Sequence, residues 1–344
     1  MGLPSISVCV PTRNRADSLR NTLAAMQRQT RPYTELVVGD DASDDETRRV
    51  VGSFNDGRIR YVRHDRNIGI YANWNALIEL CSGDYVCIYH DHDEYLGTIL
   101  ERSAHLLDQH PDMTFAHTAL TAITSTGDVV RVDIQPFAAV MLGADLRRCL
   151  AKGLYSPVMA ATAMVRRTAY LKVGSYEPAR YGLGCDKHMW FRLAQEGTVG
   201  YVAEPQANIR VREKGAQSAV FPWEDFFGSL RMRHEEVAEL YATNPVVRSA
   251  ATWRVNREKD FGLLMFSLRA LLVDHQEEWS PEDEHVIGYM GLGTRLLYRA
   301  ARASEPIQWL LKSVALPLHY KRIARRAAAE RQRAEAYLAQ HNAN

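Results

Sequence analysis

Acidic residues follow two apolar stretches of the sequence, and they are the residues best placed to do chemistry. An acidic pair ending at Asp41 follows the run at 35–39, and Asp91 and Asp93 follow the run at 84–89. Carboxylates that converge repel one another unless a divalent cation or several hydrogen-bond donors lie between them. Carboxylate oxygens suit Mg²⁺ or Mn²⁺, which also take oxygens from a diphosphate. The pattern therefore predicts a divalent-ion site with Asp91 and Asp93 as ligands, and a solvated acidic turn is the alternative.

Strands and helices alternate along the first third of the chain, and these elements must position the acids. The pattern predicts strands at 6–10, 35–39, 59–62, 84–89 and 113–122 and helices beginning at Asp17 or Ser18 and spanning about 72–80 and 98–109. Such alternation predicts an α/β fold with a largely parallel sheet and helices on both faces. Ligands of these sheets bind outside the carboxyl ends of the strands, which is where the acids lie.

The pattern of predicted secondary structure changes twice after this alternating part. Beyond residue 125 short strands and helices are mixed, and from about Trp223 onwards the pattern is helical only. We therefore predict two domains, residues 1–222 and a helical region over residues 223–344. No internal repeat or low-complexity linker marks the boundary.

Composition and charge exclude several classes of function. The 344 residues are 46% hydrophobic and 24% charged with a formal net charge of +1, so no global field favours nucleic acid. Five widely spaced cysteines without a CxxC pair favour reduced thiols, and neither Cys nor His clusters at the spacing of a zinc site. No signal peptide or apolar run long enough to span a bilayer is recognisable. We expect a cytoplasmic protein, with contact to the inner face of the membrane left open.

Seven segments, in order, resemble glycosyltransferase family 2, whose members have the GT-A nucleotide-sugar-binding fold. His90-Asp-His-Asp-Glu94 is close to the family's H-D-D-D-E variant of the metal motif, and Val38-Gly-Asp-Asp-Ala-Ser-Asp44 is close to V-D-D-G-S-x-D, with Ala42 in place of Gly. The other similar segments are residues 8–14, 67–75, 165–174, 185–192 and 209–218. Each segment alone is a weak signal, whereas seven in the family's order over about 220 residues are a strong one.

The resemblance implies an inverting transferase and a role for individual residues. The nucleotide pocket would be lined by Pro11, Thr12 and Arg13. Asp41 would hydrogen-bond the base and Asp91 would face the ribose, while Asp93 would ligate Mn²⁺ or Mg²⁺. Asp186 would be the catalytic base, and Arg210 would help to close the site over the diphosphate.

Three positions depart from the family pattern. His92 replaces the middle acid of the metal motif, which removes a charge but leaves the two outer ligands. Cys185 replaces the first acid of the pair that ends in Asp186. Arg212 stands where the family often has a metal-assisting His; since Arg cannot ligate a metal, we expect it to contact phosphate.

Inverting transfer requires few groups. The charge that develops on the leaving diphosphate must be neutralised, here by a metal at Asp93 with Arg210 or Arg212 nearby. A carboxylate opposite the leaving group, proposed as Asp186, must accept the proton of the acceptor hydroxyl. The alternative role for Asp186 is the N-cap of a helix over 188–193. Trp74 and Trp190 are expected in the core more readily than stacked on a sugar, and His90, His92 and His188 are each expected to be ordinary solvated or packed histidines.

The sequence leaves the role of the C-terminal residues open. Residues 300–344 contain eight Lys or Arg against three Glu, after an apolar stretch that bears Trp309. This region would either pack on its own protein, lie on an anionic membrane surface or self-associate.

The expected partners are a nucleotide-sugar donor, with UDP favoured by family frequency, and a carbohydrate or lipid-linked acceptor in bacterial surface polysaccharide assembly. The competing functions are a phosphohydrolase that uses Asp91 and Asp93, and a catalytically silent nucleotide-sugar binder.

Overall fold

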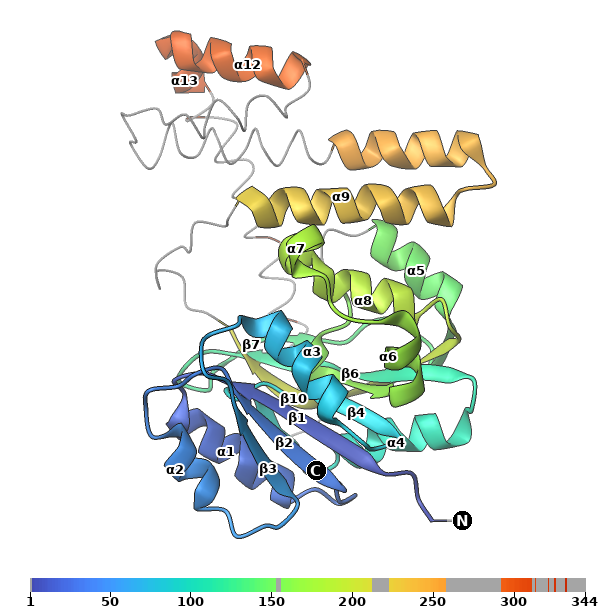
Figure 1. Cartoon of the computed structure of the whole chain (residues 1–344). Coiled ribbons are helices and arrows are strands. Elements are labelled where there is room, and N and C mark those ends of the chain that lie inside the picture. Colours follow the sequence, from blue (N-terminus) through green and yellow to red (C-terminus); the bar gives the residue numbers. More distant parts are fainter. Residues whose placement is uncertain are drawn as a thin grey trace. The chain divides into compact units, whose positions relative to one another are not determined.

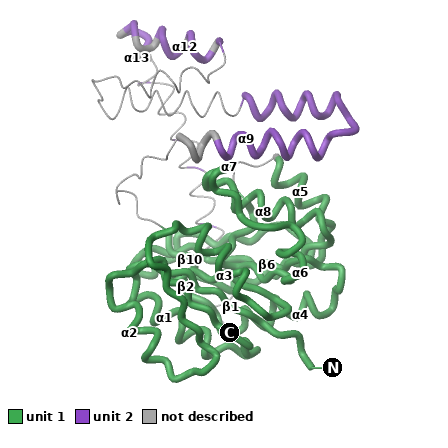
Figure 2. Tube along the Cα trace, in the orientation of Figure 1, with its two compact units in different colours: residues 1–220, 333–344 green, residues 221–332 purple. Residues whose placement is uncertain are grey.

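The computed structural model describes residues 2–152, 156–211, 223–257 and 292–310, with single residues at 313, 321, 325 and 332. The chain divides into two compact units, residues 1–220 with 333–344 and residues 221–332 (Figure 2). The predicted boundary at residue 222, as a division between domains, stays a prediction.

The first unit carries the predicted α/β elements, and Figure 1 shows helices on both faces of its sheet. Its strands are β1 (Ile6–Thr12), β2 (Glu35–Asp40), β3 (Ile59–Arg63), β4 (Tyr85–Ile88), β5 (Glu94–Tyr95), β6 (Met113–Ile123), β7 (Val129–Asp133), β8 (Val140–Leu142), β9 (Ala163–Arg166) and β10 (Thr198–Arg210). Its helices are α1 (Ala16–Gln27), α2 (Thr47–Gly52), α3 (Ile70–Leu80), α4 (Ile99–Gln109), α5 (Gly143–Lys152), α6 (Arg167–Val173), α7 (Pro178–Tyr181) and α8 (Cys185–Leu193).

The ten strands form one sheet of order β3-β2-β1-β4-β9-β6-β10-β5, with β7 paired to β6 and β8 to β10. Strands β1 to β4 are parallel, as are β6 and β10. Strand β9 runs antiparallel to both β4 and β6, and β5, β7 and β8 are also antiparallel to their partners. The prediction of a largely parallel sheet thus holds for β1 to β4 and for the pair β6 and β10, but not for the other strands. Strand β9, which lies between β4 and β6 and is antiparallel to both, makes the sheet mixed.

Alternating side chains of the first strands build a core on each face of the sheet. Val8 and Val10 of β1 are fully buried in a cluster with Leu19 and Leu23 of α1, because successive strand residues point to opposite faces. On the other face, α3 approaches Gly39 so closely that a Cβ there would lie 2.6 Å from an Asn73 side-chain oxygen. This glycine lets α3 dock directly beside the strand end that carries the acidic pair.

Helix α1 begins without the side-chain cap that the sequence predicts. The helix starts at Ala16, and neither Asp17 nor Ser18 is its N-cap. Instead Asp45 reaches across from the next loop, and its Oδ2 accepts a hydrogen bond of 2.9 Å from the Ala16 N–H. The same carboxylate accepts from Thr47 at the start of α2. One aspartate thus satisfies orphan donors of two helices, a long-range contact that local sequence patterns do not reveal.

Ala42 occupies a left-handed backbone conformation with φ of 60°. A Cβ disfavours this region by about 1–2 kcal/mol per residue, whereas glycine enters it freely. Replacing Ala42 with Gly, the residue usual in similar sequences, is expected to stabilise the protein by about 0.5–1 kcal/mol after the greater chain entropy of Gly is subtracted. Denaturant unfolding of the two proteins measures this, and an unchanged or lower stability would contradict it.

His117 lies in the middle of β6 among Phe115, Phe137 and Tyr201. Both ring nitrogens are enclosed without a hydrogen-bond partner among the described residues, and burial lowers the pKa of His117 to about 3. The unfolded chain therefore binds this proton near pH 6.5 while the native state does not. Stability is full above pH 6.5 and falls as the pH is lowered toward 3.

Between pH 8 and pH 5 we expect His117 alone to lower the free energy of unfolding by about 2 kcal/mol. In His117→Leu this part of the acid sensitivity should vanish. Urea unfolding at the two pH values measures it. An equal pH dependence in the variant would show that His117 contributes nothing.

The described residues of the second unit are mostly helical. It contains α9 (Trp223–Leu240), a helical stretch over residues 245–257, α12 (Leu292–Ala303) and α13 (Glu305–Leu310). The helices predicted from about Trp223 onwards are confirmed for these residues. Most of the basic C-terminal stretch lies outside the described residues, although Trp309 of α13 is 67% exposed. Among the helices that the structure describes, none is both long and apolar enough to cross a bilayer.

Candidate active site

A pocket of about 500 Å³ opens at the carboxyl ends of β1, β2 and β4. Five of its residues were predicted from the sequence, namely Pro11, Thr12, Arg13, Asp41 and Asp91. The remaining lining residues were not predicted to line a pocket, although the sequence placed some of them in similar segments; they are Arg15, Asn67, Gly69, Ile70, Asn73, His90 and His92. The parallel half of the sheet thus brings both acidic strand ends to one cavity.

Asp41 forms one wall of this pocket and is almost fully buried. Its two carboxylate oxygens accept hydrogen bonds from the backbone N–H groups of Ile68 (2.7 Å) and Gly69 (3.0 Å). The Asp41 N–H in turn donates to the Thr12 carbonyl at 2.9 Å. These contacts tie three loops together and fix the carboxylate at the pocket wall.

Asp91 also lines the pocket and is held by Thr12, Arg15 and His92. Its Oδ2 accepts a hydrogen bond of 2.7 Å from the Thr12 hydroxyl, and its Oδ1 forms an ion pair of 3.1 Å with Arg15. Burial acts to raise the pKa of Asp91, but the hydrogen bonds from His92 and Thr12 and the charge of Arg15 outweigh it, so the pKa lies below its usual value. Asp91 is therefore an ionised carboxylate in the pocket lining.

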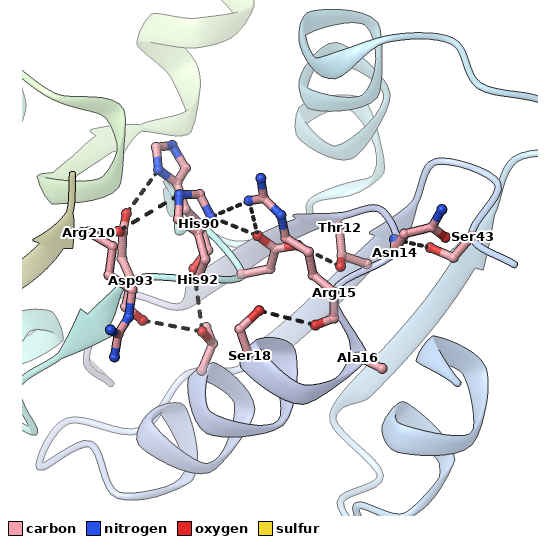
Figure 3. Close-up of polar contacts among 12 residues, drawn as sticks. Thr12, Asn14, Arg15, Ala16, Ser18, Ser43, His90, His92, Asp93 and Arg210 are labelled. Carbon is pink, nitrogen blue, oxygen red and sulfur yellow. Dashed lines mark hydrogen bonds and ion pairs between the residues drawn. The ribbon is translucent and has the colours of Figure 1, made fainter. Parts of the chain in front are cut away.

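Asp93 is buried and is not among the residues that line this pocket. Its Oδ2 lies 3.0 Å from Nδ1 of His90, and its Oδ1 accepts a hydrogen bond of 2.9 Å from the Arg210 N–H (Figure 3). His90, His92 and Asp93 each offer a ligand atom within 4.8 Å of the others. The donor set is therefore chemically suited to a divalent ion. The expectation that His does not cluster at metal-ligand spacing was wrong for this segment.

Of the two arginines that the sequence proposes as contacts of the diphosphate, the structure describes only Arg210. The Arg210 guanidinium forms an ion pair with Glu94 and donates to the Ser125 carbonyl at 2.8 Å. It is not among the residues that line the pocket, so its contact with a diphosphate stays a prediction that requires this ion pair to open. Arg212 lies outside the described residues.

Asp186 stands in the first turn of α8 and does not cap it. The N-cap position is Gly184, and no side chain caps the helix there. Oδ1 of Asp186 is enclosed and accepts no hydrogen bond among the described residues. Burial raises the pKa of Asp186 to about 7, although the charge of His90 partly opposes this shift. A carboxyl with a pKa near neutrality is suited to accept a proton from a substrate hydroxyl.

His90 connects the pocket, Asp93 and Asp186. It lines the pocket, lies in hydrogen-bond contact with Asp93, and is close enough to act electrostatically on Asp186. Its ring stacks on Trp74 with centroids 5.7 Å apart. Trp74 and Trp190 are both buried, as expected for core residues. His90 is therefore linked to Asp93 by a hydrogen-bond contact and to Asp186 by charge.

Comparison with known proteins places this pocket in a family. Residues 7–173 match the profile of Glycosyl transferase family 2. The chain belongs to this family. The match covers β1 to α6, which include every strand that borders the pocket. The chain is accordingly a glycosyltransferase.

Relatives and solved structures agree with this assignment. The chain is 26% identical to EpsE of Bacillus subtilis (strain 168), named as a glycosyltransferase, over 61% of this chain and 73% of that protein. It is 33% identical to WcaA of Escherichia coli (strain K12), whose name places it in colanic acid biosynthesis, over 27% of this chain and 34% of WcaA. The structure of residues 1–349 of S. aureus TarS aligns with a TM-score of 0.61 at 17% identity, covering 91% of each chain. The family 2 chain thus shares the GT-A fold of TarS, as predicted.

Proposed function

We propose that this family 2 enzyme transfers a sugar from a nucleoside diphosphate donor, with UDP favoured, to an acceptor hydroxyl with inversion at the anomeric carbon. The observation that supports this proposal most is the pocket at the strand ends. Asp41, Asp91 and His90 line this pocket, and the charge of His90 acts on Asp186. Nucleotides bind at this edge of open α/β sheets. A phosphohydrolase would not require a second acidic strand end or a base on α8.

The donor nucleotide is assigned to the pocket between β1 and α3. Asp41 would hydrogen-bond the base, Asp91 would face the ribose, and Pro11, Thr12 and Arg13 would line the remainder. The TarS region with the same fold has been solved in complex with UDP-GlcNAc and with UDP. This supports a uracil nucleotide for the present enzyme.

Asp186 would accept the acceptor's proton as the hydroxyl attacks the anomeric carbon. A single base is enough because no covalent sugar–enzyme intermediate forms in an inverting reaction. At the other end Asp93, with Arg210 and Arg212, would face the leaving diphosphate. A divalent ion, when bound there, would neutralise the charge that develops on that group.

The acceptor is proposed to be a growing surface polysaccharide or its lipid-linked precursor. One relative, from Campylobacter jejuni, is named a GalNAc(5)-diNAcBac-PP-undecaprenol glucosyltransferase and is 35% identical over 28% of this chain and 33% of that protein. The aligned part therefore covers only a third of that protein. A lipid-linked acceptor would bring the enzyme to the inner face of the membrane, and the basic C-terminal residues would favour anionic lipids there.

The pH dependence of transfer should report Asp186. A base must be deprotonated to act, so with a pKa of about 7 the rate should fall about tenfold per pH unit below 7 and level off above it. The raised pKa also means that the native state binds this proton more tightly than the unfolded chain, so its contribution to stability is present at acid pH and is lost as the pH rises through 7. Initial rates between pH 5 and 9 test the assignment. A rate independent of pH below 7 would contradict it.

Thermal shift measurements with a panel of nucleotide sugars, with and without Mn²⁺, test the donor class. We expect uridine diphosphate sugars to raise the melting temperature, and to do so more strongly with Mn²⁺. If only non-nucleotide phosphate esters stabilise the protein, the phosphohydrolase reading replaces this one.

A further inference from the structure

Helix α3 borders the nucleotide pocket and also holds the connection that leads to α8. Ile70 and Asn73 of this helix line the pocket. Asn75, on the same helix, forms two hydrogen bonds with the backbone of Tyr176, which lies between α6 and α8. Its Nδ2 donates to the Tyr176 carbonyl oxygen at 3.0 Å, and its Oδ1 accepts from the Tyr176 N–H at 2.9 Å. Because one amide binds both backbone groups of Tyr176, this residue is fixed relative to α3.

Tyr71 makes a second connection from the same face of α3, since it lies one turn before Asn75. Its hydroxyl donates to the Leu183 carbonyl oxygen at 3.3 Å, in the short helix η2 (Gly182–Gly184) that directly precedes α8. Its ring stacks on that of Tyr176 with centroids 5.8 Å apart. Helix α3 therefore contacts the connection between α6 and α8 near both of its ends.

Helix α8 binds the start of the same connection through Arg192. The Arg192 guanidinium donates to the carbonyl oxygens of Val173 at 2.8 Å and of Ser175 at 2.6 Å. Asp186 lies in the first turn of this helix. The residues around Tyr176 are thus hydrogen-bonded both to the helix that lines the nucleotide pocket and to the helix that carries the proposed base.

The Tyr176 side chain is also part of the surroundings of Asp186. Its ring is buried, and its hydroxyl oxygen lies 3.4 Å from that of Tyr170. Burial raises the pKa of Tyr176 above its ordinary value, and the charges of Tyr170 and Asp186 act in the same direction. The hydroxyl is therefore close enough to Asp186 to interact with its charge, and a shift of this ring would change the surroundings of the carboxylate.

We propose that Asn75 is a positioning residue, which holds Asp186 in place relative to the nucleotide pocket through the backbone of Tyr176. A base must lie within hydrogen-bond reach of the hydroxyl that attacks the anomeric carbon, and a misplacement of about 1 Å can cost about 100-fold in rate. Asn75 is not among the described residues that line the pocket, so it should affect the rate rather than the donor affinity. The inference rests on the proposed function, since it takes Asp186 as the base.

A double-mutant cycle on the full chain tests this proposal. Asn75→Ala removes both hydrogen bonds, and it is made in the native protein and in Asp186→Asn. Tyr71→Phe, which keeps the ring and loses only the hydroxyl, repeats the comparison with a smaller change to the fold. Glu79→Ala is the matched control, because Glu79 is exposed one turn further along α3. Circular dichroism checks that every variant is folded.

Two quantities are measured in each protein. The first is the rate at which uridine diphosphate is released from the uridine diphosphate sugar that raises the melting temperature most, at a saturating concentration. Water serves as the acceptor, and Asp186 would take its proton as the oxygen attacks the anomeric carbon. The second quantity is the affinity for uridine diphosphate in the presence of Mn²⁺, from calorimetric titration.

We expect Asn75→Ala to lower the rate by about 10–100-fold and to leave the affinity for uridine diphosphate unchanged within about twofold. Tyr71→Phe should lower the rate by less, and Glu79→Ala should match the native enzyme. In Asp186→Asn, the further change Asn75→Ala should alter the rate by less than about threefold, because the group that Asn75 positions is already gone.

A native rate in Asn75→Ala, or an equal loss of rate in both backgrounds, would overturn the inference and leave nucleotide-sugar transfer intact. A parallel loss of affinity for uridine diphosphate would do the same, because it would show a general disruption of the pocket. If Asp186→Asn itself keeps the native rate, or if the native enzyme releases no uridine diphosphate from any of these sugars, the proposed function fails together with the inference.

Discussion

Replacing Asp186 with Asn is expected to lower the rate of sugar transfer by about 10²–10⁴-fold, the usual contribution of a general base. Asn has nearly the same shape but cannot accept the hydroxyl proton. Because Asp186 lies on α8, apart from the loops that form the nucleotide pocket, donor affinity should be nearly unchanged. The measurement pairs release of the nucleoside diphosphate with calorimetric titration of the donor.

Asp145→Asn is the matched control for this experiment. Asp145 is half exposed on α5 and pairs only with Arg148 among the ion pairs described. It should transfer sugar at the native rate. Full activity in Asp186→Asn would remove Asp186 from the mechanism. A native protein that binds donor yet never transfers sugar would favour the silent-binder alternative.

Replacing Asp93 with Asn should reduce transfer by about 10²–10³-fold, the scale of losing one preorganised electrostatic group at a developing charge. The amide can still accept from the Arg210 N–H and remain beside His90, so the local fold should survive. What disappears is the negative charge that would hold a divalent ion. Unlike Asp186→Asn, this variant should also lose the dependence of donor affinity on Mn²⁺.

Initial rates and donor affinities at several Mn²⁺ concentrations distinguish the two variants. Asp145→Asn again serves as the control and should keep the native metal dependence. If Asp93→Asn responds to Mn²⁺ as the native enzyme does, the ion is not held at Asp93 and the assignment of this carboxylate is wrong.

The sequence located the first half of the fold and much of the pocket because the relevant signals are local. Apolar runs that end in acids mark strand termini, and parallel strands bring those termini to one edge. Asp41 and Asp91 could therefore be placed at the pocket from spacing alone, before any family resemblance was considered. The role of Asp186 came from the resemblance, since nothing in its local pattern separates a base from a helix cap.

The parts that sequence reasoning missed depend on contacts between distant residues. The pairing of β9 with both β4 and β6 made the sheet mixed, and the capping of α1 by Asp45 replaced a local cap. The ion pair of Arg210 with Glu94 joins residues 116 positions apart. His90 and His92 did carry a local signal, since they flank Asp91 in the metal motif. Because each histidine was interpreted separately, this shared position beside Asp91 was overlooked.

Calorimetric titration of the purified enzyme with uridine diphosphate in the presence of Mn²⁺ tests the central claim most directly, because the claim is that the strand-end pocket binds a nucleoside diphosphate. The account predicts saturable binding with one site per chain, and its loss in Asp41→Ala, which removes the carboxylate that Ile68 and Gly69 hold at the pocket wall. If neither uridine diphosphate nor any other nucleoside diphosphate binds, or if Asp41→Ala binds as the native enzyme does, the pocket is not the donor site and the account is contradicted.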